Sequence, residues 1–316
     1  MARFHLYIYQ TQNWRAEMSE NFIRSYRMSA GAAGRSGFAI GTSTGISPHI
    51  AFSVEKSAAE AANTAKIQVW NLSPSSLSVL DTKDCLIELK AGYGNNMALI
   101  LVGNVVSVVT QLDGADRLTE IEVVDGRVEI RDTYLSLSYD GQVNAKVVFD
   151  NVIAEMGVSA VYSEGSSTAF VEFPNGFSFI GSAGNALTKL CNACGLVWSM
   201  QNQVLQIRQP NEPISARGYL LSSDTGLLEV PKRITLAAES AEGSAAETSG
   251  KKDEKNVKIG YEVRFFMNAA IGVNDYVQLE SSVTRGYFRV DKLTIDGDNL
   301  EGEWTCTAQL FEVKGA

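Results

Sequence analysis

The chain has 316 residues, of which 45% are hydrophobic and 20% charged, a balance typical of a soluble globular protein of about two or three domains. The formal net charge of −9 argues against a protein that neutralises nucleic-acid phosphates, because such surfaces are rich in Lys and Arg. No apolar run reaches the roughly 18 residues that a membrane-spanning helix needs.

The first 125 residues are dominated by alternating apolar and polar positions, the pattern of strands with one buried face. Met1–Arg15 alternates in this way and lacks the basic and apolar regions of a signal peptide, so we expect a strand there. A short helix is predicted after Ser73-Pro74. Turn residues recur about every 8–12 positions, which indicates a barrel, and we assign residues 1–125 to a first tube-like β-barrel. The further strands are predicted at residues 50–54, 65–69, 85–91, 97–110 and 118–124.

Five glycines lie between Gly31 and Gly45. A phosphate-binding loop would need Lys-Ser/Thr after the glycines and a strand-then-helix frame, and this stretch has neither. We therefore predict a mobile hairpin or loop.

Residues 126–209 change to helical periodicity. Helices are predicted over residues 145–156 and 183–194, each with one apolar face and each followed by a glycine that can end it. Two strand-like segments flank a turn at residues 201–203. This pattern predicts a small α/β module with two helices.

Residues 210–316 return to strand patterns and are assigned to a second tube-like β-barrel. Within it, residues 238–256 contain no aromatic and no large aliphatic side chain, so this segment is expected to be a flexible insertion. The predicted fold class is therefore mainly β, with two β-barrel domains flanking a small α/β module. The strands are expected at residues 258–265, 276–280, 287–295 and 303–312.

Few side chains suit catalysis. The two histidines, His5 and His49, lie in strand-like patterns away from any nucleophile motif. Cys191 and Cys194 form a C-x-x-C pair, but late in a helix, on its apolar face, and without the second ligand pair of a zinc site. We interpret both thiols as small core residues.

The run from Asp296 to Asn299 resembles part of a calcium loop, but the spacing of its glycine and the absence of the closing Glu fit a polar turn better. The spacing of the four cysteines does not suggest a disulfide framework, so synthesis in a reducing host cytoplasm is expected. We therefore expect no enzymatic activity, no catalytic residue, no cofactor and no metal site.

Several short motifs resemble the phage tail and baseplate hub family. A strand ending in Asn71-Leu72-Ser73 is followed by a short helix and a second strand ending in Ala91-Gly92-Tyr93. Ser222–Leu227 resembles that family's entry into its second barrel, and Asp296–Asp298 followed by Glu303-Trp304 resembles its closing hairpin. These motifs cover most of the chain in the family's order.

The resemblance implies a structural hub subunit with two tube-like barrels. Three copies would form a trimeric, pseudo-sixfold ring that joins a tail tube to a tip spike and lines the DNA channel. The implied partners are the tail tube protein, a spike or tip protein and other baseplate proteins, with DNA only in transit. The implied location is the tail or baseplate of the virion.

Two alternatives remain at this stage. One is a tail-associated cell-wall hydrolase, because the 36 acidic residues supply enough carboxylates for the pair that glycoside hydrolysis needs. The other is a peptidoglycan- or carbohydrate-binding module, with residues 126–209 as the binder.

Overall fold

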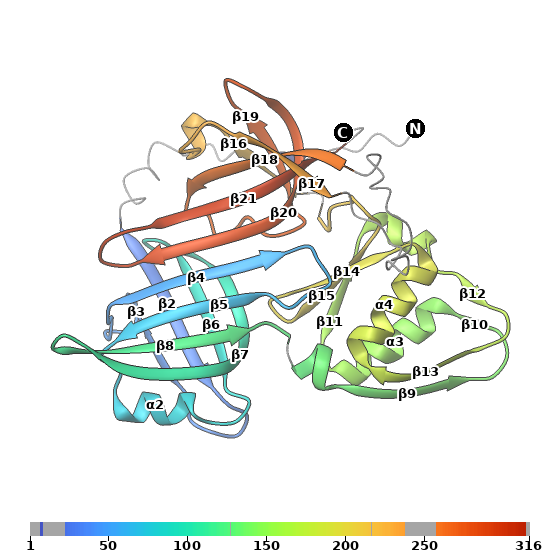
Figure 1. Ribbon diagram of the computed structural model, residues 1–316, viewed down its shortest axis with the longest axis horizontal. Coiled ribbons are helices and arrows are strands. Elements are labelled where there is room, and N and C mark those ends of the chain that lie inside the picture. The colour runs from blue at the N-terminus through green and yellow to red at the C-terminus, as the bar shows by residue number, and fades with distance from the viewer. Residues whose placement is uncertain (1–6, 9–22, 127, 216, 238–256, 314–316) are drawn as a thin grey trace, which may run out of the picture.

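The computed structural model (Figure 1) describes residues 7–8, 23–126, 128–215, 217–237 and 257–313. Most of its strands belong to one 14-stranded sheet that continues through two barrels, while the two helices of the α/β part lie to one side. The insertion predicted at residues 238–256 and the histidine at position 5 fall outside the described residues. Within the described residues, no helix has the length and apolar character needed to cross a membrane.

The first barrel has the strand order β4-β5-β8-β7-β6-β2-β3, curled so that β2 and β6 lie behind β4 and β5 (Figure 1). The strands of this barrel show the predicted alternation. In β4, for example, Ile50, Phe52 and Val54 are buried, and the residues between them face outward. Its elements are β2 (Arg24–Gly31), β3 (Phe38–Gly41), β4 (Ile50–Ser57), β5 (Thr64–Trp70), α2 (Pro74–Leu80), β6 (Leu86–Tyr93), β7 (Asn96–Asp113) and β8 (Asp116–Val124).

The second barrel is built mainly from the last hundred residues, but the start of the chain also reaches it. Tyr7 and Ile8 pair with β16 in parallel, so this part of the predicted first strand lies against the second barrel and not the first. A local strand pattern carries no information about its pairing partner, which explains the difference. The elements are β1 (Tyr7–Ile8), β16 (Arg217–Leu221), β17 (Lys232–Ala237), β18 (Val257–Phe266), β19 (Tyr276–Glu280), β20 (Arg285–Asp298) and β21 (Trp304–Glu312).

Strand β20 joins the two barrels. One of its edges pairs with β21, while the other edge pairs first with β19 and then, from Lys292 to Asp298, with β4 of the first barrel. The apolar side chains of both barrels accordingly form one continuous buried cluster. The two barrels therefore share one core.

The α/β part has a buried apolar cluster of its own, made by residues between Leu135 and Ile207. Both helices begin and end as predicted: Asn144 and Ser182 cap their first turns, and Gly157 and Gly195 end them in the left-handed conformation. A single π-helical turn at Val128–Asp132 leads into this part from the first barrel. The other elements are β9 (Tyr134–Tyr139), β10 (Val143–Asn144), α3 (Ala145–Met156), β11 (Ser159–Tyr162), β12 (Glu172–Phe173), β13 (Phe177–Ser182), α4 (Ala183–Cys194), β14 (Val197–Gln201) and β15 (Val204–Arg208).

Candidate functional site

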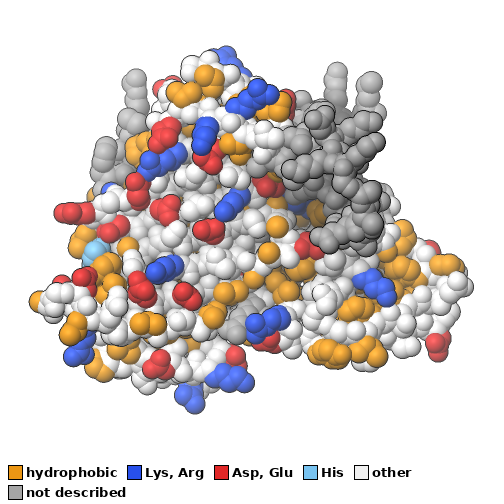
Figure 2. Space-filling view, in the orientation of Figure 1, with side chains coloured by type: hydrophobic (Ala, Val, Ile, Leu, Met, Phe, Trp, Pro, Cys, Tyr) orange, Lys and Arg blue, Asp and Glu red, His pale blue; other side chains and the backbone are white. Residues whose placement is uncertain are grey.

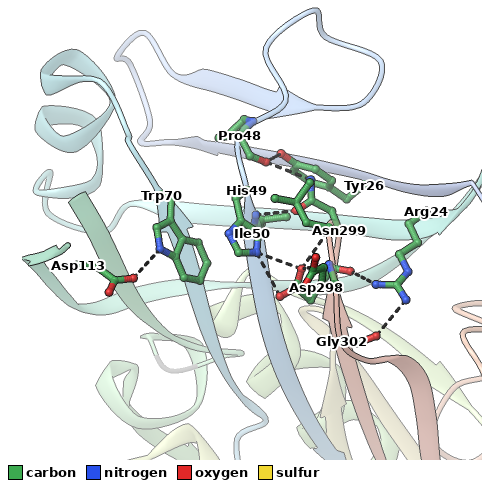
Figure 3. Close-up of polar contacts among 12 residues, drawn as sticks. Arg24, Tyr26, Pro48, His49, Ile50, Trp70, Asp113, Asp298, Asn299 and Gly302 are labelled. Atoms are coloured by element: carbon green, nitrogen blue, oxygen red, sulfur yellow. Dashed lines mark hydrogen bonds and ion pairs between the residues drawn. The ribbon is translucent and has the colours of Figure 1, made fainter. Parts of the chain in front are cut away.

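The turn between β20 and β21 is fastened to the first barrel by polar contacts (Figure 3). The guanidinium of Arg24, on β2, donates to the backbone oxygens of Asp298 (2.6 Å) and Gly302 (3.0 Å). The side-chain oxygen of Asn299 accepts from the backbone N–H of Ile50 (2.8 Å). The last hairpin of the chain is thus bound to strands that lie about 250 residues earlier in the sequence.

His49 belongs to the same contact region. Its Nε2 lies 3.0 Å from Oδ1 of Asp298, and its ring stacks on Trp70 with centroids 3.9 Å apart. Trp70 in turn donates from Nε1 to Asp113 (3.0 Å). Burial of Asp298 opposes its ionisation, but bonds from backbone N–H groups of the turn and from His49 outweigh this effect and lower its pKa. The geometry gives His49 a joining role between strand and hairpin (Figure 3).

A second polar joint connects the α/β part to the first barrel. Asp125, fully buried at the end of β8, accepts from the backbone N–H groups of Asn202 (2.6 Å) and Gln203 (2.8 Å). These two residues form the β14–β15 turn and both have positive φ, 54° and 62°, which aims their N–H groups at the carboxylate. The ammonium of Lys56 donates to the side chain of Asn202 (2.8 Å), and Asn63 donates to Asp125 (3.3 Å).

Burial governs the ionisation of this joint. It lowers the pKa of Lys56 to about 8, against the attraction of Asp125, which favours the charged form. It also raises the pKa of Asp125, although three donors and Lys56 oppose that rise. Each charged group is therefore held in place by its hydrogen bonds, which replace the water that burial removes.

The β14–β15 hairpin is also hydrogen-bonded to the second barrel. The side chain of Asn274 donates to Gln206 (2.8 Å) and to Ser199 (3.3 Å) of β15 and β14. Arg289 of β20 is fully buried and donates to Asn274 (2.6 Å) and to Asp291 (3.1 Å). The β14–β15 hairpin is therefore hydrogen-bonded to both barrels, although the apolar cluster of the α/β part is separate from theirs.

The outer side of the joined sheet is a broad polar surface, which we call the polar face: the outward side chains of β18, β21, β20, β4, β5 and β8. The register aligns Thr307, Thr294 and Glu55 in one row that crosses from the second barrel to the first. Figure 2 shows acidic and basic side chains interspersed over it. Among the described residues, none of the large exposed apolar side chains lies on β4, β5, β20 or β21.

Several exposed apolar side chains lie instead at the two lateral ends of this sheet. At one end, Val109 and Leu112 of β7 are 51% and 77% exposed, on a part of β7 that pairs with β8 but, within the described chain, with no strand on its other edge. At the other end, Val230 and Phe266 are 65% and 49% exposed near β17, which pairs only with β18 among the described strands. Each end combines an open strand edge with apolar surface, which is typical of an interface.

The structure also places the other residues that the sequence analysis considered as possible sites. The thiols of Cys191 and Cys194 are free and buried in α4, and burial raises the pKa of both. The turn predicted at Asp296–Asn299 begins only after Asp298, because Asp296 and Gly297 still belong to β20. The glycine-rich stretch after Gly31 forms the β2–β3 hairpin. Over the residues that the structure describes, no cluster of three or more His, Cys, Asp or Glu side chains could hold a metal ion.

Sequence reasoning missed the residues that hydrogen-bond the β14–β15 hairpin to the two barrels. Asp125 follows a strand and Asn274 precedes one, and both positions match ordinary turn residues. Their partners lie 68 to 78 residues away in the chain, so no local spacing marks them. One signal was usable. The alternation of β4 places Lys56 at a buried position, where a charged side chain is rare.

No protein-family model matches the chain, and no curated protein matches it by sequence. Solved structures nevertheless share its fold. The 43 kDa tail protein of prophage MuSo2 from Shewanella oneidensis superposes with a TM-score of 0.57 at 9% identity, over 90% of this chain and 98% of that protein. The tail protein from Neisseria meningitidis MC58 gives a TM-score of 0.57 at 10% identity, over 91% and 97% of the two chains.

A third similar structure comes from a secretion system. The E. coli c3393 protein, a type VI secretion component with structural similarity to the T4 tail proteins gp27 and gp5, gives a TM-score of 0.55 at 10% identity, over 85% of this chain and 74% of that one. At such low identity these likenesses show the fold. The predicted mainly β fold is confirmed, and solved phage tail proteins share it.

Proposed function

We propose that this chain is a structural hub subunit of a phage-type tail or baseplate, and that three copies form a pseudo-sixfold ring around a channel. The observation that carries the proposal is the double pairing of β20, which joins the two barrels through one continuous sheet. Three such units supply six barrels, so a threefold ring can stack on a sixfold tube.

The two lateral ends of the polar face explain how such a ring closes. The strands run β17-β18-β21-β20-β4-β5-β8-β7, with an open edge and exposed apolar side chains at each end. Contact between β7 of one copy and β17 of the next is a head-to-tail interface, and such interfaces generate closed rings when the rotation per copy fits. The polar face then lines the channel, where water and not protein covers it.

The first test is the mass of the assembled protein. Light scattering coupled to size exclusion is expected to give three times 34.2 kDa, alone or after addition of a tail-tube or spike protein. Negative-stain images are expected to show a ring of six densities. A particle that stays monomeric at every concentration, and also with those partners present, would contradict the proposal.

A pair of variants tests the interface itself. Val109→Lys with Leu112→Lys places two charges in the proposed contact and is expected to give monomers that remain folded, because both side chains are exposed in the single chain. Val161→Lys with Ile180→Lys changes two exposed apolar residues of the α/β part and serves as the matched control. Trimers that persist in the first variant would place the contact elsewhere.

A further inference from the structure

Among the side chains that the structure describes, three cations near the centre of the polar face each have a carboxylate from a neighbouring segment beside them. Their side chains are between 28% and 60% exposed, so these are surface pairs. They are Lys66 with Glu120 (3.4 Å), Lys292 with Glu55 (3.1 Å), and Arg264 with Glu229 (3.0 Å) and with Glu303.

The face also carries carboxylates without such a partner. Asp296 on β20 and Glu122 on β8 have no cation within ion-pair distance among the described residues. Glu122 lies directly opposite Lys66 in the β5–β8 register, yet the ammonium is paired with Glu120. Among the described side chains, the face therefore presents some free negative charges, while its three central cations are paired.

Stability alone does not account for this arrangement, because exposed ion pairs contribute little to folding and are screened by salt. DNA affinity, in contrast, depends directly on how many cations are available to replace the counterions of the phosphates. A cation that already has a carboxylate at about 3 Å gains little by approaching a phosphate, and that phosphate also meets the repulsion of the carboxylate.

Building on the proposed function, we infer that these ion pairs mask the cations of the polar face from DNA phosphates. Duplex DNA can then move along the face through the ring without binding to it. The masking is local: it depends on which side chains are paired, and not only on the net charge of −9.

The test unmasks two lysines. In the full chain, Glu55→Gln and Glu120→Gln remove the partners of Lys292 and Lys66, and Glu122→Gln prevents the opposite carboxylate from replacing Glu120. Binding to a fluorescein-labelled duplex of about 30 base pairs is measured by anisotropy over about 50 to 200 mM salt. The triple variant is expected to bind at least roughly tenfold more tightly than the wild type, with a log–log salt slope of about −2 per subunit.

The control removes three carboxylates from the α/β part, by Asp140→Asn, Glu155→Gln and Glu164→Gln. All three side chains are exposed, and the change in net charge is the same. This variant is expected to bind no more DNA than the wild type. The inference is overturned if the control and the unmasked variant bind equally, or if the wild type already binds as tightly as the unmasked variant.

The mass of each preparation is measured together with its DNA binding. Failure of the masking inference can therefore be told apart from failure of the proposed hub function. A trimer whose unmasked variant ignores DNA removes the inference and leaves the hub proposal standing. A strict monomer whose unmasked variant binds DNA removes the hub proposal, although the masking effect itself is then still observed.

Discussion

Phe52 of the first barrel and Trp304 of the second meet edge-to-face, with ring centroids 5.6 Å apart, across Gly297 of β20. Gly297 pairs with both residues, and a Cβ at its position would lie 2.2 Å from the Phe52 ring. The missing side chain is therefore what lets the two rings come together. Trp304 also donates from its indole nitrogen to the backbone oxygen of Gly92 (3.2 Å), which adds β6 as a fourth strand to the contact.

The contact between Phe52 and Trp304 predicts that one methyl group added at Gly297 lowers the free energy of unfolding. Gly297→Ala forces the Phe52 ring away from Trp304, and overpacking of this kind costs about 1–3 kcal/mol of unfolding free energy. The matched control is Gly286→Ala in the same strand, where the nearest atom to the new Cβ lies at an ordinary 3.4 Å. Urea denaturation of both variants measures the difference. Equal stabilities would show that the two rings can separate at no cost.

The buried joint around Asp125 predicts a second stability effect. Asp125→Ala leaves the N–H groups of Asn202 and Gln203 without their acceptor and Lys56 without a counter-charge. Loss of one partner from a buried charged network costs about 3–5 kcal/mol. Hydrogen exchange should report the loss first in the β14–β15 turn, since the α/β part keeps its own apolar cluster. The control is Asp140→Ala, at an exposed position. A wild-type-like exchange rate at the turn in the Asp125 variant would contradict the joint.

Lys56 predicts a pH dependence with a definite sign. Burial lowers its pKa to about 8 from 10.5, so between these values the unfolded chain binds more protons than the folded one. The free energy of unfolding contributed by this residue therefore rises with pH across that window. Buried thiols with raised pKa values, such as that of Cys306 at about 12, act in the opposite direction above pH 9.

The thiol contribution cancels when wild type and Lys56→Met are compared at each pH. The stability of the wild type relative to the variant is expected to increase by roughly 1–3 kcal/mol from pH 7 to 10. Urea midpoints at half-unit steps of pH give this difference. A difference that stays constant over the range would mean that Lys56 titrates alike in the folded and unfolded chains.

The sequence was informative wherever structure is local. The helix from Ala145 to Met156 has a capping Asn144 and a terminating Gly157, and both signals lie within the element that they delimit. Strict alternation from Trp304 to Leu310 likewise predicted β21 without reference to any other strand. Strand β9 was not predicted, although its alternation of leucine and serine is itself a strand pattern.

The sequence did not predict which distant strands pair with each other. Lys292 of β20 pairs with Ser57 of β4, and no property of either segment names the other as its neighbour. The shared core, the Asp125 joint and the polar face all follow from such long-range pairings. The motif resemblance supplied the order of the parts, but the residues that join them required the structure.

The helix thiols give a last prediction, directed at the C-x-x-C pair. Cys191 and Cys194 are buried with raised pKa values, and a thiol that stays protonated is a poor nucleophile and a poor metal ligand. We therefore expect both to react with Ellman's reagent only as the protein unfolds, with the same urea midpoint as the loss of circular dichroism. Added zinc should leave that midpoint unchanged, because a site that bound zinc in the folded chain would raise it. Cys191→Ala with Cys194→Ala is the control for assigning the signal, since Cys85 and Cys306 remain. Rapid labelling of the native wild type that this control lacks would show that the pair is accessible and reactive.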